Sequence, residues 1–431
     1  MNILFIHQNF PGQFRHLAGH LAANPQNRVV AICQPQAPRH AKVPNTLVYT
    51  PSRKSAPGTH HYLRTLEEGV LNGQAVAKIL LKLKKEGFTP DIIIAHPGWG
   101  EALYAKDIFP ATPLLSHFEF YYHADGADSN FDPEYPLTLD GRTRIRTRNA
   151  LHLLNLEACD AGVSPTHWQK SLHPAEFHSK ISVIHEGVDT SLAAPNPQQS
   201  FTLPNGRMLT ISDEVITYVS RNLEPYRGFH QFMHAAQEIC QRRPNCQIVI
   251  VGGDGVSYGQ RLPNGQTYRQ KLLQEVSIDP ARVHFLGKIP YQHYLALLQV
   301  SSAHVYLTVP FVLSWSMLEA MSTGCLVIGS DTPPVREVLE HGRNGQLVDF
   351  FSPGRIADRV DDVLNHPDRM AQLRSNARET ILSCYPAGQS LTAYAALIET
   401  MVGQPRKNAS AASTDDHVRK SPETLATACS G

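Results

Sequence analysis

The chain of 431 residues carries 39 basic and 38 acidic side chains, for a formal net charge of +1. This length predicts two domains of roughly 200 residues, and the balanced charge argues against a general nucleic-acid-binding protein. The seven cysteines lack CxxC spacing, the 22 histidines form no HExxH or Cys/His cluster, and neither a long apolar run nor a charged leader is evident. We therefore expect a cytoplasmic protein without a bound metal or a membrane span.

The first half of the chain alternates apolar runs with helical patterns. It opens with a strand, a Pro-Gly turn and an amphipathic helix, and a second strand precedes a long helix over about residues 62–85. The runs PDIIIAH and PLLSH predict two buried strands that end in His96 and His117. A turn-rich acidic loop then leads to a helix over about residues 144–158. Such alternation is typical of parallel βαβ units.

The Pro- and Asn-rich residues 193–206 interrupt this pattern and predict an interdomain linker. The linker separates an amino-terminal domain at 1–192 from a carboxyl-terminal domain at 207–383, and each is expected to be a Rossmann-like, doubly wound sheet. A final amphipathic helix is expected at 384–403, and the polar residues 404–431 predict a disordered tail. Ligands in such sheets bind beyond the carboxyl ends of the strands, here in a cleft between the domains.

Two arginines stand where the first strand of the second domain passes into a helix. Arg221 follows the strand in VSRNLEPYRGF, and Arg227 and Gly228 begin the helix. Guanidinium groups and helix-terminal amides attract anions, and three or four charge-assisted bonds of roughly 1.5–3 kcal/mol each would hold a diphosphate. Gly253, in the VGGDG turn after the next strand, is a weaker candidate for the same sheet edge. Either arginine alone could equally be an ordinary surface residue.

Residues 303–350 are the most informative stretch, because they predict a strand, a loop, a helix, a strand, a helix and a strand. The helix SMLEAM carries Glu319 in its first turns and stops at Gly324. A carboxylate there can accept hydrogen bonds from the two adjacent hydroxyls of a ribose. The alternative is a solvated helix glutamate.

Together these motifs resemble the family 4 glycosyltransferases (GT4), retaining enzymes of the two-Rossmann GT-B architecture, over nearly the whole chain. The resemblance implies that Arg221 and Arg227–Gly228 grip the diphosphate of a UDP- or GDP-sugar. It implies that Glu319, as the second acid of the family's E-x7-E motif, binds the donor ribose. It also implies that the final helix returns to the amino-terminal domain. Arg227 stands where the family has lysine, so a planar fork replaces a point charge.

Phe311 stands where the family has the first glutamate of that motif. Phenylalanine cannot accept hydrogen bonds from the hydroxyls of the transferred sugar. The resemblance implies that backbone N–H groups around Val312, Leu313 and Ser314 meet the sugar instead, and the alternative is that Phe311 only fills space.

In the amino-terminal half, the resemblance implies that Gly12, in the loop after the first strand, approaches the donor phosphates. It also implies that a strand-end histidine faces the donor sugar, with His117 as the catalytic candidate and His96 as the second choice. Either histidine could instead simply cap its strand.

Four arginines in GRTRIRTRN form two i,i+4 pairs on one face of a predicted helix. Three interpretations stay open: a solvated face, a site for an anionic acceptor, or peripheral contact with the cytoplasmic face of an anionic membrane. The residues are Arg142, Arg144, Arg146 and Arg148.

The resemblance implies hexosyl transfer, with retention, from a nucleotide diphosphate sugar to a glycan, a lipid-linked saccharide or a small molecule, in polysaccharide or glycoconjugate biosynthesis. The nucleotide sugar is the co-substrate and no cofactor is expected. Two alternatives remain: a sugar-nucleotide 2-epimerase of the same fold, and a catalytically impaired nucleotide-sugar-binding or scaffold protein. The nucleobase, sugar, acceptor and linkage stay open.

Overall fold

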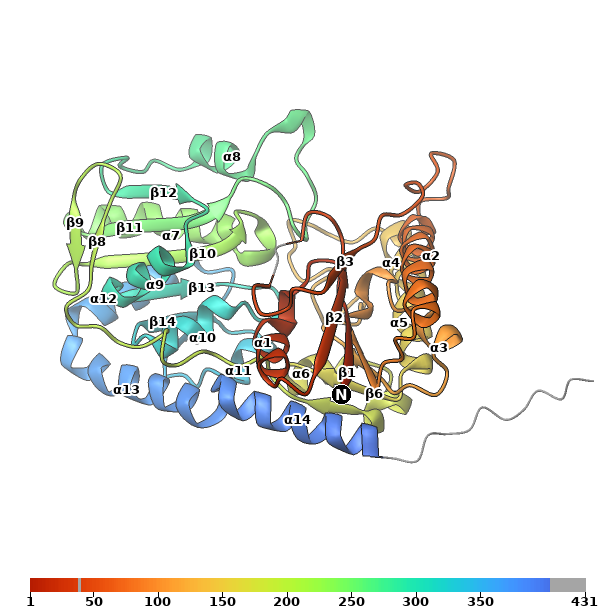
Figure 1. Cartoon of the computed structure of the whole chain (residues 1–431). Coiled ribbons are helices and arrows are strands. Elements are labelled where there is room, and N and C mark those ends of the chain that lie inside the picture. Colours follow the sequence, from red (N-terminus) through yellow and green to blue (C-terminus); the bar gives the residue numbers. More distant parts are fainter. Residues whose placement is uncertain (38–39, 404–431) are drawn as a thin grey trace, which may run out of the picture.

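Two large β-sheets with helices on both faces form the body of the protein (Figure 1). The computed structural model describes residues 1–37 and 40–403. The predicted disordered tail lies outside the described residues. Every strand pairing within both large sheets is parallel, which confirms the predicted α/β class with two doubly wound sheets.

The amino-terminal sheet has seven strands in the order β3-β2-β1-β4-β5-β6-β7. They are β1 (Asn2–Ile6), β2 (Arg28–Cys33), β3 (Thr46–Val48), β4 (Ile92–Ala95), β5 (Leu114–His117), β6 (Ala161–Ser164) and β7 (Ile181–Val183). Strand β1 is buried on both sides: Ile3 and Phe5 join one hydrophobic cluster, and Leu4 and Ile6 join another. Continuous hydrophobic runs are what a parallel sheet covered on both faces requires.

Helices α1 and α14 contribute to the first of these clusters, and α2 and α5 to the second. The helices before the second sheet are α1 (Arg15–Ala23), α2 (Arg64–Lys85), α3 (Ala105–Ile108), α4 (Leu139–Arg148), α5 (Ala150–Ala158) and α6 (His167–Ser171), with 3-10 turns at Gly12–Phe14, Pro97–Trp99 and Ala175–Lys180. The single helix predicted over 144–158 is wrong. It is two helices that meet at Asn149, whose side-chain amide bonds the backbone of Tyr122 in both directions at 2.8 and 3.1 Å.

The carboxyl-terminal sheet has six strands in the order β12-β11-β10-β13-β14-β15. They are β10 (Val215–Asn222), β11 (Gln247–Gly253), β12 (Val283–Gly287), β13 (Ala303–Tyr306), β14 (Leu326–Ser330) and β15 (Gln346–Val348). An antiparallel hairpin of β8 (Ser200–Thr202) and β9 (Met208–Thr210) precedes them. The predicted linker at 193–206 therefore contains one strand of that hairpin.

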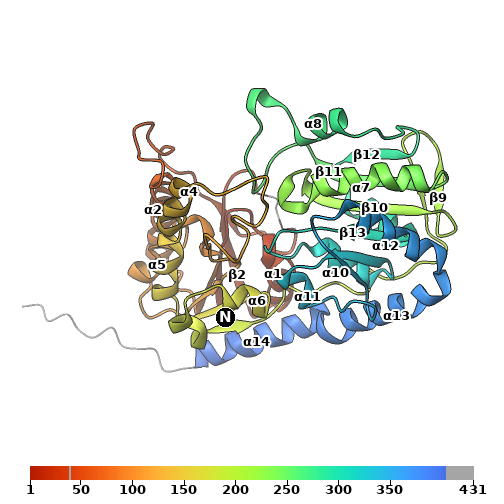
Figure 2. The ribbon, with the colours of Figure 1, turned by 180° about the vertical axis from the view of Figure 1, so that it is seen from behind.

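Helices α7 and α12 cover one face of this sheet, turned to the viewer in Figure 2, and α9 and α10 cover the opposite face, seen in Figure 1. The helices of this half are α7 (Phe229–Arg242), α8 (Tyr268–Glu275), α9 (Tyr291–Val300), α10 (Trp315–Ser322), α11 (Pro333–Arg336), α12 (Pro353–Asn365), α13 (Pro367–Cys384) and α14 (Ala387–Gly403), with 3-10 turns at Pro225–Arg227 and Pro263–Gly265.

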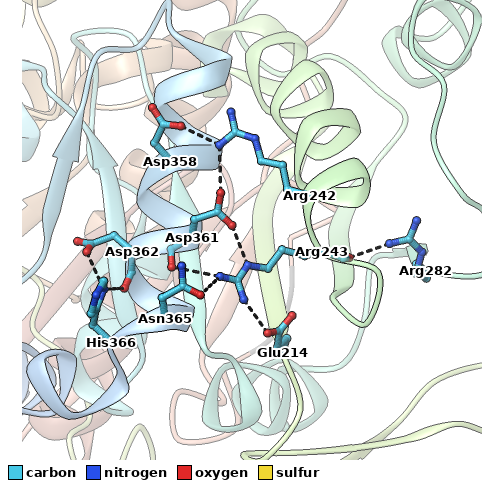
Figure 3. Close-up of polar contacts among 9 residues, drawn as sticks. All are labelled: Glu214, Arg242, Arg243, Arg282, Asp358, Asp361, Asp362, Asn365 and His366. Atoms are coloured by element: carbon cyan, nitrogen blue, oxygen red, sulfur yellow. Dashed lines mark hydrogen bonds and ion pairs between the residues drawn. The ribbon is translucent and has the colours of Figure 1, made fainter.

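An ion-pair network fastens α7 to α12 on the outer face of this sheet (Figure 3). Arg242 bonds Asp358 at 2.7 Å and Asp361 at 3.1 Å, and Arg243 bonds Asp361 at 2.7 Å and Glu214 at 2.8 Å. Because α7 begins beside Arg227, this network holds the helix that positions that arginine.

Helix α14 crosses from the carboxyl-terminal half to the amino-terminal sheet (Figure 1). Its Tyr394, Ile398 and Met401 are buried in the same hydrophobic cluster as Ile3 and Phe5 of β1. The expected return of the final helix to the first domain is confirmed.

Glu101 is a buried acid, and it predicts a pH effect on stability. Its Oε1 accepts the Tyr49 hydroxyl at 2.7 Å, and burial raises the pKa of its carboxyl from 4.5 to about 7. The neutral carboxyl makes its full contribution to the free energy of unfolding below 4.5, the pKa of this group in the unfolded chain. As the pH rises from 4.5 toward 7, the free energy of unfolding falls by roughly 3 kcal/mol.

Glu101→Gln is therefore expected to raise the free energy of unfolding by up to roughly 3 kcal/mol at about pH 8 and to change it little at about pH 4. Urea denaturation at the two pH values measures this difference. An equal effect of the substitution at both pH values would contradict the assignment of a raised pKa.

Candidate active site

The carboxyl ends of the two sheets meet at the junction between the domains. Phe120, three residues after β5, has its ring centroid 4.7 Å from that of Phe311, which follows β13. The guanidinium of Arg15, at the start of α1, lies 4.7 Å from the ring centroid of Trp315 and 5.7 Å from that of Tyr291. The two sheet edges at which ligands are expected are thus in direct contact.

Arg227 is buried and holds the segment that links β13 to α10. Its Nη1 donates hydrogen bonds to the Tyr306 hydroxyl at 3.2 Å, the Thr308 hydroxyl at 2.8 Å and the Val312 carbonyl at 2.8 Å. The loop expected to meet the donor sugar is therefore fixed by a permanent positive charge. Arg221, at the end of β10, is exposed, so it can approach an anion from solvent.

Two aromatic rings lie together on one side of the Arg227 guanidinium. Its Cζ lies 5.7 Å from the ring centroids of both Tyr258 and Phe311, which are themselves 4.8 Å apart. The buried carboxylate of Glu224 fixes the loop that carries Tyr258, because it accepts the backbone N–H groups of residues 257–259 at 2.8–3.1 Å. Phe311 thus covers a cation, and a planar guanidinium suits this place better than an ammonium group does.

Two of the predicted glycines are required by backbone geometry. Gly228 has a φ of 64°, and a Cβ there would lie 2.5 Å from the Leu307 side chain. Gly12 has a φ of 46°, and a Cβ there would lie 2.5 Å from the His7 ring. At Gly253 a Cβ would lie 2.7 Å from the Asn222 side chain. All three glycines allow close approach at a sheet edge.

Glu319 is buried in α10 and bonded by two tyrosines of α9. The Tyr291 hydroxyl donates to Oε1 at 2.7 Å, and the Tyr294 hydroxyl donates to Oε2 at 2.8 Å. Burial raises the pKa of the Glu319 carboxyl above its ordinary value, and the two tyrosine hydroxyls oppose that rise. Each oxygen keeps a lone pair for a second donor. Ser314 caps α10 by accepting the Ser316 N–H at 3.4 Å.

A hydrogen-bond chain in the amino-terminal domain ends on Glu119, two residues after β5. The Asn9 N–H donates to His7 Nδ1 at 2.9 Å, so the proton of His7 is on Nε2, which lies 2.8 Å from Gln13 Oε1. The Gln13 amide then donates to Glu119 Oε1 at 2.8 Å. Burial lowers the pKa of His7 to about 3, which keeps its ring neutral.

His96 is a second neighbour of Glu119, in close contact with it but without a hydrogen bond. Its Nδ1 accepts the Gly98 N–H at 3.2 Å, and its Nε2 lies 3.5 Å from Glu119 Oε2. Burial by itself would raise the pKa of Glu119, but the contacts with His96, His117 and Gln13 outweigh burial and lower it. The Glu119 side chain is 29% exposed at the domain junction, so it presents an ionised carboxylate there.

His117, the histidine expected to face the donor sugar, lies deeper than Glu119. It is 2% exposed, its Nδ1 lies 3.3 Å from the Tyr394 hydroxyl of α14, and its Nε2 lies 3.5 Å from Glu186. His96 is also buried and stacks on Trp99, with the ring centroids 4.5 Å apart. Both predicted histidines are thus buried, whereas Glu119, two residues after His117, is partly exposed.

The four arginines of α4 do not form one free cationic face. Arg142 makes a bidentate ion pair with Asp125 at 2.5 and 2.7 Å, and the Cζ of Arg148 lies 3.6 Å from the ring centroid of Tyr122. Arg144 and Arg146 are exposed. The four arginines lie on one helix, as predicted, but the acidic loop and an aromatic ring each engage one of them.

A cavity of about 330 Å³ lies between this region and the carboxyl-terminal domain. Arg144 and Arg148 line it from α4, and Tyr226 and Tyr258 line it from the second domain. Because Tyr258 also contacts Arg227, the cavity adjoins the predicted diphosphate site. It offers a ligand aromatic faces, cations and the carboxylates of Asp128, Asp132 and Asp140.

Several of these residues could not be identified from the sequence: Glu119, Gln13, Glu224, Tyr258, Tyr291 and Tyr294. Only the i,i+3 spacing of the two tyrosines on an amphipathic helix gave a signal, and core packing explains such spacing equally well.

Among the described residues, none of the helices is both long and apolar enough to cross a bilayer.

Family models match both halves of the chain. One described as "Glycosyl transferase family 4 group" matches residues 25–193, and one described as "Glycosyl transferases group 1" matches residues 208–380. D-inositol 3-phosphate glycosyltransferase of Corynebacterium efficiens is 25% identical over 203 residues, which is 46% of this chain and 46% of that protein. GDP-mannose-dependent alpha-(1-6)-phosphatidylinositol monomannoside mannosyltransferase of Mycobacterium tuberculosis is 27% identical over 47% of this chain and 51% of that protein. The matched region thus spans about half the length of these curated relatives.

Solved structures share the whole fold. HepE from Anabaena in complex with UDP-glucose superposes with a TM-score of 0.67 and 18% identity, over 93% of this chain and 100% of that one. Sucrose-phosphate synthase from Thermosynechococcus elongatus gives a TM-score of 0.68 and 17% identity, over 93% and 99% of the two chains. At this identity the likeness shows the two-domain fold. With the two family models covering most of its length, the chain belongs to the family 4 glycosyltransferases of the GT-B architecture.

Proposed function

We propose that the protein transfers a sugar from a UDP- or GDP-sugar to an acceptor at the domain junction, with retention of the anomeric configuration. The placement of two buried charged groups carries this proposal. The Arg227 guanidinium bonds the Val312 carbonyl in the loop before α10, and the Glu319 carboxylate lies in α10 itself. Glu319 accepts the two ribose hydroxyls on its remaining lone pairs. Arg221, Arg227 and the start of α7 neutralise the diphosphate.

In the reaction, the bond between the sugar and the diphosphate breaks, leaving positive charge on the sugar and negative charge on the departing phosphate oxygen. Arg227 is buried beside two aromatic rings. Out of water, a fixed charge interacts strongly with developing negative charge. The acceptor hydroxyl attacks the same face of the sugar, and the departing phosphate oxygen takes its proton. No separate carboxylate base is required.

Glu119 supplies the acid that position 311 lacks. The next residue in the chain, Phe120, packs against Phe311, which stands where the family has its first glutamate. Gln13 and His96 hold the Glu119 carboxylate ionised, and its exposed side leaves lone pairs for sugar hydroxyls. We assign to Glu119 the recognition of the transferred sugar and the stabilisation of the positive charge that forms on it.

The cavity beside Tyr258 suits a saccharide acceptor that carries an anionic group. Sugar rings stack on aromatic faces such as those of Tyr226 and Tyr258, and Arg144 and Arg148 would pair with the anion. Such acceptors include charged glycans and lipid-linked saccharides, and we propose a role in polysaccharide or glycoconjugate biosynthesis on the cytoplasmic side. Contact of Arg144 and Arg146 with an anionic membrane stays a prediction.

A thermal-stability screen with UDP, GDP, ADP and the corresponding sugars tests donor binding. We expect either the uridine or the guanosine series to stabilise the protein, by roughly 2.7 kcal/mol at about 100 times the dissociation constant. Glu319→Gln is expected to reduce this shift, because the amide accepts fewer bonds from the ribose, whereas the exposed Glu399→Gln should leave it unchanged. Absence of stabilisation by every nucleotide would contradict the proposal.

A further inference from the structure

A loop of the amino-terminal domain, residues 125–137, lies against the carboxyl-terminal domain. The Phe131 ring stacks on Phe351, with the centroids 5.2 Å apart, and meets Phe350 at 5.4 Å. The Asp128 carboxylate accepts the Tyr226 hydroxyl at 2.7 Å. Between these two contacts, Asp132 faces His230, which lies in the first turn of α7.

The Asp132–His230 contact is close but is not a hydrogen bond. Asp132 Oδ2 lies 3.0 Å from His230 Nε2, and the two side chains are 7% and 5% exposed. Even so, Oδ2 and both ring nitrogens of His230 lack a hydrogen-bond partner among the described residues. The other Asp132 oxygen, Oδ1, accepts the Glu134 N–H at 3.0 Å, which fixes the orientation of the carboxylate.

Glu134 brings a third ligand atom to the same place. One atom each from Asp132, Glu134 and His230 lies within 4.8 Å of the other two. A well-aligned, hydrogen-bonded ion pair would account for the burial of Asp132 and His230 without any third partner. The two side chains are not aligned in this way. Buried polar atoms without any partner are costly. A cation beside the line that joins Asp132 Oδ2 and His230 Nε2 would accept a lone pair from each of these atoms.

We propose that Asp132, Glu134 and His230 bind one divalent transition-metal cation, of which Zn²⁺ is the best match. One imidazole nitrogen and two carboxylate oxygens suit this ion better than Mg²⁺ or Ca²⁺, which prefer oxygen ligands alone. Because Glu134 is exposed, a fourth position is open to water. The sequence shows no such motif because the third ligand stands almost a hundred residues after the first two.

The site joins the two domains. Its aspartate and glutamate come from the amino-terminal loop, and its histidine stands two residues after Gly228 at the start of α7. A bound cation would hold this loop against α7 and so keep the walls of the neighbouring cavity, which include Asp132 and Tyr226, in place. Its role is structural and independent of the proposed sugar transfer, which requires no metal.

The test uses the full chain, treated with a chelator and then titrated with Zn²⁺ or Co²⁺. We expect one equivalent to bind, the thermal midpoint to rise and Co²⁺ to give the absorption bands of a low-symmetry site. His230→Ala and Asp132→Asn should each lower the affinity at least tenfold. His234→Ala, on the same helix but exposed, is the matched control and should bind as the unchanged protein does.

Glu134→Gln keeps the test decisive if the buried variants do not fold, because this exposed position tolerates the change. It too should lower the Zn²⁺ affinity, with no loss of thermal stability in the absence of metal. The proposal is overturned if the unchanged protein binds no Zn²⁺ or Co²⁺, or if Glu134→Gln and His230→Ala bind the ion as tightly as His234→Ala.

Discussion

Methionine in place of Arg227 is expected to lower kcat/KM for sugar transfer by about 10³-fold, which corresponds to roughly 4 kcal/mol of lost transition-state stabilisation. The guanidinium is the buried positive charge nearest to the loop that meets the donor sugar. The same substitution should reduce the free energy of unfolding by roughly 3 kcal/mol, since the Val312 carbonyl and the Thr308 hydroxyl lose a donor. Initial rates of nucleoside diphosphate release and urea denaturation measure the two effects.

Arg227→Lys is the matched control. It restores the residue of the family motif and keeps the charge, and three ammonium N–H donors can replace the three bonds of Nη1. Most of the activity should return, although the contact of the cation with the Tyr258 and Phe311 rings is weakened. Turnover by the methionine variant within tenfold of the unchanged protein would show that Arg227 only supports the fold.

Glu119→Gln is expected to lower kcat by about 10²-fold and to leave the affinity for the nucleoside diphosphate unchanged. Glutamine preserves the shape of the side chain and can still accept the Gln13 amide, but it removes the negative charge opposite the sugar. Kinetics with the donor, together with calorimetric titration of UDP or GDP, separate the two quantities.

The exposed Glu157→Gln, in the same domain, controls for a general loss of charge and should change neither quantity. An equal loss of nucleotide affinity and turnover in Glu119→Gln would mean that the residue orders the whole domain junction. An unchanged kcat would remove Glu119 from the reaction.

The architecture could be predicted because its signals are local. Apolar runs, turn residues and helical periodicity marked β10, α7, β11 and α10 close to their observed limits. Periodicity does not carry contacts between residues far apart in the sequence. The two helices found in place of the one predicted over 144–158 meet at Asn149, whose side chain bonds the backbone of Tyr122, a residue more than twenty positions earlier.

The sequence could predict the candidate site only where one motif contains both the functional residue and the residue that it contacts. The Arg227 and Glu319 positions follow from the family motifs, whereas the tyrosines that bond Glu319 come from another helix. The sequence presented Arg227 and Phe311 as two separate departures from the family. The structure shows that they belong together, because the Phe311 ring covers the guanidinium. Glu119 was missed because no motif marks it, and the role that we propose for it depends on the contact of its neighbour Phe120 with the other domain.

Proton NMR of the unchanged protein with the nucleotide sugar that stabilises it most tests the central claim directly. The account predicts release of the nucleoside diphosphate and appearance of the sugar, in a product or as slowly formed free sugar, with the anomeric configuration of the donor. Release of a sugar altered at carbon 2, a product of inverted configuration, or an intact donor after prolonged incubation with every nucleotide sugar would contradict it.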